Sequence, residues 1–208
     1  IDDFGIRPIE RLQKLNLLGP NLIAVHMVHL TNEEINLLKV HNCNVIHCPS
    51  SNMKLASGIA PIVDLVNQSI NVAIGTDGAA SNNRLDMFEE MRLTALLGKV
   101  TRGAQALPTH QILQMATLNG AIALGIEKQT GSLTVGKAAD ITAIDFSDLS
   151  LTPCFNPLSH LIYVASREHV SHVWVNGRLL LNKGELVTLN EAELIECSQY
   201  WQNRITSK

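Results

Sequence analysis

The sequence predicts an α/β fold in which a parallel sheet is followed by a smaller antiparallel β unit. In the first third of the chain, a short apolar run, a turn and a segment with helical periodicity occur three times in succession, a pattern typical of βα units. Near the C-terminus, Asn176-Gly177 separates two β-branched runs and predicts a tight hairpin. Because only 4% of the residues are aromatic, the core must be mainly aliphatic.

Composition excludes several classes of protein. The chain has 208 residues, 46% hydrophobic and 17% charged, which indicates a globular protein with one large domain or one and a half smaller ones. A net charge of −3 without runs of like charge gives no sign of a nucleic-acid or membrane partner. No apolar stretch approaches the roughly 20 residues of a membrane span. Four scattered cysteines suit a reducing cytoplasm, where we expect the protein to be.

The first half of the chain supplies the βα units. Thr31 and Glu34 form a capping box, which predicts a helix that begins there and ends near residue 40. We expect a loop over residues 49–58. The strands are expected at 21–28, 44–48 and 71–76. The other helices are expected at 8–18, 61–68 and 85–97.

After residue 97 the pattern changes to short helices and glycine-punctuated β-branched runs. Pro108 precedes a segment with helical periodicity, which predicts a helix start. The predicted helices cover 109–118, 121–124, 156–165 and 191–203. The predicted strands cover 132–135, 140–145, 172–175 and 178–181.

Three polar side chains lie near the ends of the predicted parallel strands, namely His26, His47 and Asp77. A doubly wound sheet and a barrel are both compatible with the pattern. In a (β/α)₈ barrel the functional residues lie at the carboxyl ends of several strands, so these three would meet at one mouth. The alternative interpretations are that Asp77 caps the next helix and that the histidines pack in the core.

Residues 41–48 hold two histidines and two cysteines, a composition that suggests zinc. Structural zinc sites favour Cys-x₂₋₄-Cys pairs repeated at a second locus, and no second pair accompanies Cys43 and Cys48 in this sequence. We therefore expect the cysteines to be small packing residues. They are Cys43, Cys48, Cys154 and Cys197.

Several motifs together resemble one family. They are His-Met-Val-His-Leu at 26–30, His-Cys-Pro-Ser-Ser-Asn-Met-Lys-Leu at 47–55, Gly-Thr-Asp-Gly-Ala-Ala-Ser-Asn-Asn at 75–83 and Gly-Ser-Leu-Thr-Val-Gly-Lys-Ala-Ala-Asp-Ile at 131–141. They resemble the amidohydrolase superfamily, in its adenosine-type deaminase and chlorohydrolase group. Within that group the motifs are most similar to deaminases of 5-methylthioadenosine and S-adenosylhomocysteine.

The resemblance implies an α/β fold of a particular kind, the C-terminal half of a TIM (β/α)₈ barrel followed by part of a small β-sandwich domain. The implied segments are a barrel half at 1–128, a sandwich portion at 129–188 and a C-terminal helix at 189–208. The chain begins at Ile1, so we expect it to be a piece of a longer protein. The expected partners are then the N-terminal half of the same protein and further copies in a homo-oligomer.

The resemblance also implies roles for the site residues. Asp77 would bind one divalent metal, expected to be zinc, contact the substrate and take a proton from the attacking water. His26 would contact that water and the substrate and help to move protons. The role of His47 stays open between structure and function. The family's His-x-His pair, a further metal histidine and a glutamate would precede residue 1.

The implied reaction of the full-length protein is hydrolytic deamination of an aminopurine nucleoside, 5′-methylthioadenosine or S-adenosylhomocysteine. The 208 residues alone are expected to be inactive. One alternative is a triazine chlorohydrolase or guanine deaminase of the same superfamily. The other alternative is a non-catalytic domain or one half of a split barrel.

Overall fold

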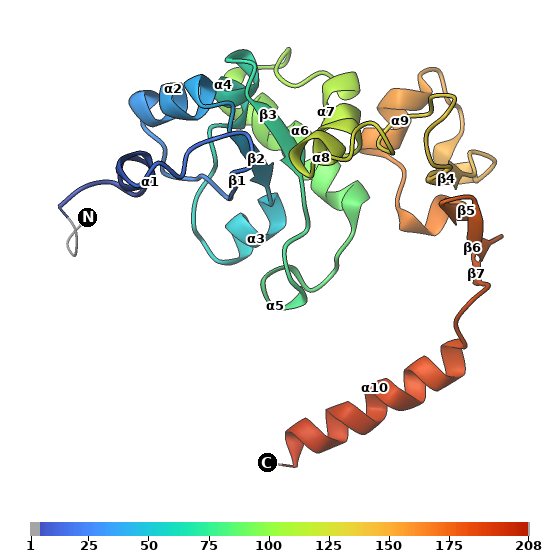
Figure 1. The fold of residues 1–208 in the computed structure, drawn as a ribbon. Coiled ribbons are helices and arrows are strands. Elements are labelled where there is room, and N and C mark those ends of the chain that lie inside the picture. The colour runs from blue at the N-terminus through green and yellow to red at the C-terminus, as the bar shows by residue number, and fades with distance from the viewer. Residues whose placement is uncertain (1–4, 208) are drawn as a thin grey trace.

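A computed structural model describes residues 5–207, and its centre is a parallel sheet of three short strands. The strands are β1 (Ile23–Val25), β2 (Asn44–His47) and β3 (Asn71–Ile74), in the spatial order β1-β2-β3. Val45 pairs with Ala24 on one side and with Val72 on the other. Figure 1 shows helices on both sides of this sheet. The predicted α/β arrangement with parallel strands is confirmed.

Helices connect the strands and cover the sheet. The capping box is present, because Thr31 Oγ1 accepts a hydrogen bond from Glu34 N–H at 3.3 Å and Glu34 Oε2 accepts one from Thr31 N–H at 2.9 Å. These helices are α1 (Pro8–Lys14), α2 (Asn32–Val40), α4 (Ile62–Asn67), α6 (Met87–Arg102), α7 (Thr109–Met115) and α8 (Leu118–Ala123). Helix α6 continues beyond the predicted end through Gly98, where a Cβ would approach Leu107 Cδ1 at 2.6 Å. A close helix–loop contact, rather than a helix end, explains that glycine.

The core is aliphatic and lies between the sheet and its helices. Its fully buried members include Leu38, Val45, Leu65, Val72 and Ile112, and they come from both strands and helices. Burying each such side chain contributes about 1.5–3 kcal/mol to folding.

Two of the four cysteines do not pack as expected. Cys43 and Cys48 are buried beside the parallel sheet, whereas Cys154 and Cys197 are exposed. The expectation was wrong for the latter pair because they lie in a surface loop and on a solvent-exposed helix.

The second unit is an antiparallel sheet in the order β4-β5-β6-β7. Asn176 and Gly177 have φ values of 49° and 75°, the two positive values that a type I′ hairpin turn requires. The strands are β4 (Ile141–Ile144), β5 (Val170–Val175), β6 (Arg178–Asn182) and β7 (Glu185–Leu186). Helix α9 (Pro157–Tyr163) packs against α6 and α7, and two short 3₁₀ turns, Leu149–Leu151 and Arg167–His169, flank it.

The predicted strand at 132–135 is wrong. Lys137 Nζ donates to Ser132 Oγ at 2.8 Å and to Thr130 O at 3.1 Å, which folds the segment into turns. Leu133 and Val135 are exposed, so their apolar character reflects no sheet partner.

The predicted loop at 49–58 is also wrong, because it contains helix α3 (Pro49–Lys54). Pro49 occupies the first turn, where the missing N–H costs nothing and the fixed φ suits a helix. A second unpredicted helix, α5 (Ala79–Asn82), follows β3. Both short helices lie at the carboxyl end of the parallel sheet (Figure 1).

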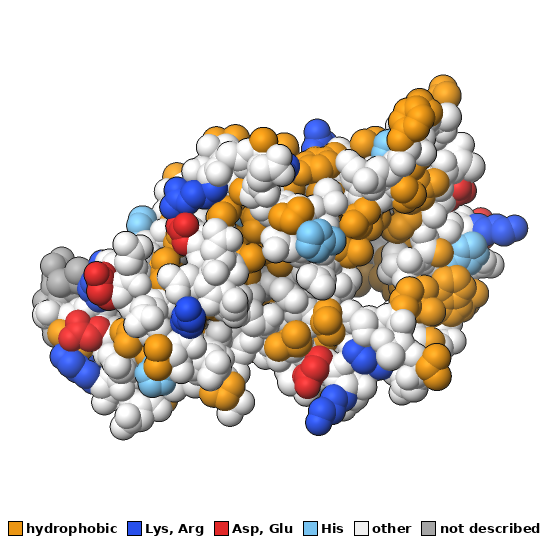
Figure 2. Space-filling model, turned by 90° about the horizontal axis from the view of Figure 1, so that it is seen from above, with side chains coloured by type: hydrophobic (Ala, Val, Ile, Leu, Met, Phe, Trp, Pro, Cys, Tyr) orange, Lys and Arg blue, Asp and Glu red, His pale blue; other side chains and the backbone are white. Residues whose placement is uncertain are grey.

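The last helix, α10 (Glu191–Thr206), lies apart from the rest of the molecule (Figure 1). Its apolar side chains Leu194, Trp201 and Ile205 are exposed. Figure 2 shows further hydrophobic side chains on the surface near the small sheet. None of the helices within residues 5–207 combines the length and apolar composition of a transmembrane segment.

Candidate active site

His26 and Asp77 lie just beyond the carboxyl ends of two strands of the parallel sheet. His26 follows β1 directly and has φ 72°, and its N–H donates to Ile46 O at 3.0 Å. Asp77 follows β3 after a two-residue gap and has φ 60°. Left-handed backbone at non-glycine residues is unfavourable and concentrates at functional sites.

The two side chains face each other across a narrow gap. His26 Nε2 is 3.8 Å from Asp77 Oδ2, and the side chains are 42% and 34% exposed. This distance is too long for a direct hydrogen bond but suits a water molecule that bridges the two atoms. The structure therefore brings together His26 and Asp77, the two residues for which the sequence analysis expects a role in the reaction.

Asp77 is held ionised by hydrogen-bond donors. Oδ2 accepts from Ser51 Oγ and from Ser81 Oγ, both at 2.7 Å, and Oδ1 accepts from Gly78 N–H at 2.7 Å. The Ser51 and Ser81 donors, followed by the Gly78 N–H, lower the pKa of Asp77 to about 2. At neutral pH the group is a carboxylate that can bind a cation or accept a proton.

His26 also has a fixed partner, which the sequence analysis missed. Its Nδ1 lies 2.8 Å from Asn52 Oδ1. Asn52 is on α3 next to Ser51, so one short helix contacts both site residues. The sequence signal for helix α3 lies in the motif at 47–55, where a proline is followed by small polar residues, as at a helix start.

A buried carboxylate connects the two short helices that surround Asp77. Glu90 on α6 is fully buried, and it accepts hydrogen bonds from Ser50 N–H at 3.1 Å and from Asn82 Nδ2 at 2.7 Å. It thereby joins α3 to α5, the two helices that carry Ser51 and Ser81. The sequence signal was a glutamate within the apolar face of α6, between Met87 and Met91.

His47 occupies the last position of β2 and is 2% exposed. Its Nδ1 has no hydrogen-bond partner among the described residues. Burial, and secondarily the charge of His26, lowers the pKa of His47 to about 4. The imidazole is therefore neutral at pH 7.

This burial makes a prediction for stability against pH. The unfolded chain binds a proton at His47 near pH 6.5, whereas the folded chain does so only near pH 4. The contribution of His47 is thus complete above about pH 6.5 and is lost as the pH falls to about 4. At 1.36 kcal/mol per pKa unit, the loss is up to about 3 kcal/mol. Urea unfolding of wild type and His47→Gln measures it, and an unchanged pH slope in the variant would contradict it.

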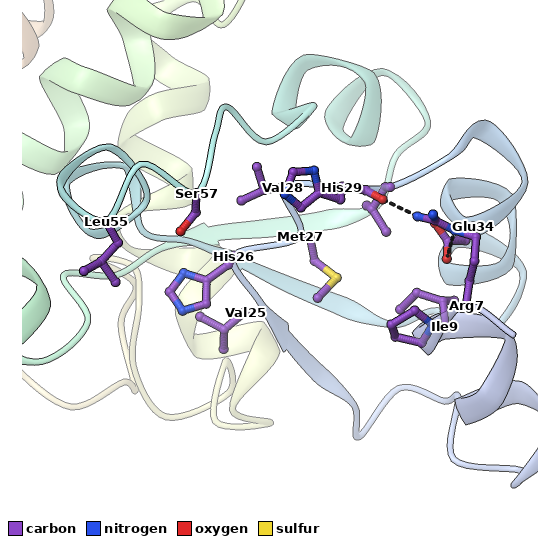
Figure 3. A pocket seen from close by; sticks show the side chains of 12 residues that line it. Arg7, Ile9, Val25, His26, Met27, Val28, His29, Glu34, Leu55 and Ser57 are labelled. Carbon is purple, nitrogen blue, oxygen red and sulfur yellow. Dashed lines mark hydrogen bonds and ion pairs between the residues drawn. The ribbon is translucent and has the colours of Figure 1, made fainter. Parts of the chain in front are cut away.

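A groove of about 630 Å³ runs beside His26, along residues 25–30 at the end of β1 and beyond it. Leu55 and Ser57 line one end, Val25 and Met27 lie between the ends, and Arg7 lies at the other end (Figure 3). There Arg7 Nη2 pairs with Glu34 Oε2 at 2.8 Å, and the same guanidinium donates to His29 O.

The site fits part of a zinc centre. The ionised carboxylate of Asp77 is a donor that zinc accepts, and a catalytic zinc ion takes about three protein ligands. No group of three or more His, Cys, Asp or Glu side chains arranged to hold a metal occurs in the part of the chain that the structure describes. The remaining donors would have to come from other residues.

Comparisons with known proteins find relatives in both sequence and structure. The profile described as the amidohydrolase family matches residues 1–180. A 5-methylthioadenosine/S-adenosylhomocysteine deaminase from Teredinibacter turnerae is 47% identical over 100% of this chain and 47% of its own length. A 5′-deoxyadenosine deaminase from Methanosphaera stadtmanae is 50% identical over 90% of this chain and 44% of its own length.

A solved structure is also similar. The adenosine deaminase from Xanthomonas campestris, with bound zinc, superimposes with a TM-score of 0.97 at 46% identity, covering 100% of this chain and 47% of that one. The chain thus spans about half the length of the curated relatives and of this structure.

Proposed function

Because this chain belongs to the amidohydrolase family, we propose that it forms part of a metal-dependent deaminase of adenosine-type nucleosides. The observation that carries the proposal is the facing pair of His26 and ionised Asp77 at the carboxyl ends of two parallel strands. Relatives that are 47% and 50% identical bear the names of such deaminases.

We further propose that the chain is the C-terminal half of a longer barrel enzyme. Within the described residues, β1 and β3 each pair on one side only, and the groove begins at Val25, the last residue of β1. Parallel sheets are normally covered on both faces, and closure into a barrel leaves no strand edge unpaired. Strands from an N-terminal half would pair with these edges and bring the missing donors beside His26. Below, "the whole protein" means this chain joined to that half.

Zinc is the metal that this donor chemistry and the zinc-bound relative favour. Asp77 would be its ligand on this chain, through a carboxylate that Ser51, Ser81 and Gly78 keep ionised. When bound, zinc supplies a Lewis acid that lowers the pKa of coordinated water towards about 7.

Two residues of this chain, Asp77 and His26, would then take part in the proton transfers of the hydrolysis. Asp77 accepts a proton from the water that attacks C6 of the purine, and His26 Nε2 accepts a hydrogen bond from the same water. The new C6–O bond forms, the C6–N bond breaks, and the proton returns to the leaving nitrogen, which departs as ammonia. General-base assistance of this kind contributes about 10²–10⁴-fold in rate.

The substrate assignment has a direct test. The whole protein is expected to release ammonia from 5′-methylthioadenosine, S-adenosylhomocysteine or 5′-deoxyadenosine, because its relatives are named for these substrates. Guanine and a chlorotriazine serve as comparison substrates in the same assay. Ammonia from guanine, or chloride from the triazine, with every adenosine left intact would assign one of the other activities of the superfamily.

A further inference from the structure

Helix α3 places two adjacent side chains on the two site residues: Ser51 donates to Asp77, and Asn52 contacts His26. We propose that Asn52 is a positioning residue that selects the tautomer of His26. Its Oδ1 accepts a hydrogen bond from Nδ1–H, which leaves the lone pair of Nε2 directed at the gap before Asp77. This inference rests on the proposed deaminase function for its role in turnover, but not for its geometry.

The tautomer decides how a water molecule lies in the gap. With the proton on Nδ1, both His26 Nε2 and Asp77 Oδ2 are hydrogen-bond acceptors, and they are 3.8 Å apart. A water between them directs its two O–H bonds at these atoms, so its lone pairs point away from both side chains. The opposite tautomer would place an N–H in the gap, which would turn the water around.

The two polar atoms of the Asn52 carboxamide differ in their contacts. The residue is 2% exposed, and its Nδ2 has no hydrogen-bond partner among the residues that the structure describes. A buried amide group without a partner is unfavourable for folding. An apolar side chain of similar size would remove that penalty, so the carboxamide must be explained by its other atom, the Oδ1 that contacts His26.

Hydrogen bonds to neighbouring residues hold helix α3 in place. Asn52 N–H donates to Cys48 O at 3.0 Å, and Ser50 N–H donates to the fully buried Glu90. Ser51 has no exposed surface. Because Ser51 and Asn52 are neighbours in one helical turn, the orientation of the carboxylate and that of the imidazole are set together.

The test compares wild type with Asn52→Leu, which removes the acceptor, and Asn52→Asp, which keeps it. The exposed Asn32→Leu is the matched control. The ¹⁵N shifts of His26 in the labelled whole protein identify the protonated ring nitrogen. We expect Nδ1 to be protonated in wild type and in Asn52→Asp, and this preference to be lost in Asn52→Leu.

For Asn52→Leu we also expect kcat to fall about 10–100-fold, as for other residues that orient a site histidine, with KM little changed. Its melting temperature should not fall.

Two results would overturn the inference. One is a proton on Nε2 in wild type, and the other is a lower melting temperature in Asn52→Leu with the tautomer and kcat unchanged. If wild type releases no ammonia from any adenosine, the proposed function fails instead. The NMR comparison still decides the role of Asn52 in that case.

Discussion

Replacing Asp77 with asparagine is expected to lower turnover of the whole protein by about 10³-fold or more and to reduce its zinc content. The substitution removes both a charged ligand and the acceptor for the proton of water, and general-base assistance alone contributes about 10²–10⁴-fold. Asparagine keeps the shape of the side chain, so the neighbouring helices should remain in place. Ammonia release and zinc content per chain measure the two effects.

The control is Asp145→Asn, an exposed carboxylate near the small sheet that accepts a hydrogen bond from Ser147 N–H. It should retain the zinc content and activity of wild type. If Asp77→Asn retained both properties as well, Asp77 would be neither ligand nor base, and its hydrogen bonds to Ser51 and Ser81 would be structural only.

The second large effect concerns residues 1–208 alone, which should neither hold zinc tightly nor deaminate. Asp77 is the one direct metal ligand that we assign within the described residues, whereas a catalytic zinc ion takes about three protein ligands. The single-sided pairing of β1 and β3 should also make the separate chain associate with itself or with the N-terminal half.

Zinc content after dialysis and sedimentation of the isolated chain test this expectation, with the whole protein treated in parallel. Adding the separately produced N-terminal half should restore zinc and ammonia release. A monomer of residues 1–208 that retains one zinc ion per chain and deaminates an adenosine would show that the ligands are all on this chain.

Local signals predicted those parts of the fold that depend on neighbouring residues. Thr31 with Glu34 and Asn176 with Gly177 act over two to four positions, and the structure contains the capping box and the hairpin. The strand expected at 132–135 failed because apolar alternation does not reveal whether a partner strand exists. Whether Leu133 meets a sheet or solvent is decided by residues far away in the sequence.

The site likewise has parts that the sequence predicts and parts that it does not. The facing of His26 and Asp77 follows from their places at the ends of parallel strands, which periodicity reveals. Asn52 contacts His26 over a separation of 26 residues, and Glu90 contacts Ser50, the neighbour of Ser51, over a separation of 40. No spacing rule relates such positions, so these contacts required the structure.

The proposed deaminase function, with Asp77 in its active site, is measured most directly by ammonia release from 5′-methylthioadenosine. Wild type and Asp77→Asn are assayed side by side as whole proteins. We expect steady release by wild type and almost none by the variant. Equal release by both proteins, or none by wild type with this nucleoside and its 5′-substituted analogues, would contradict it.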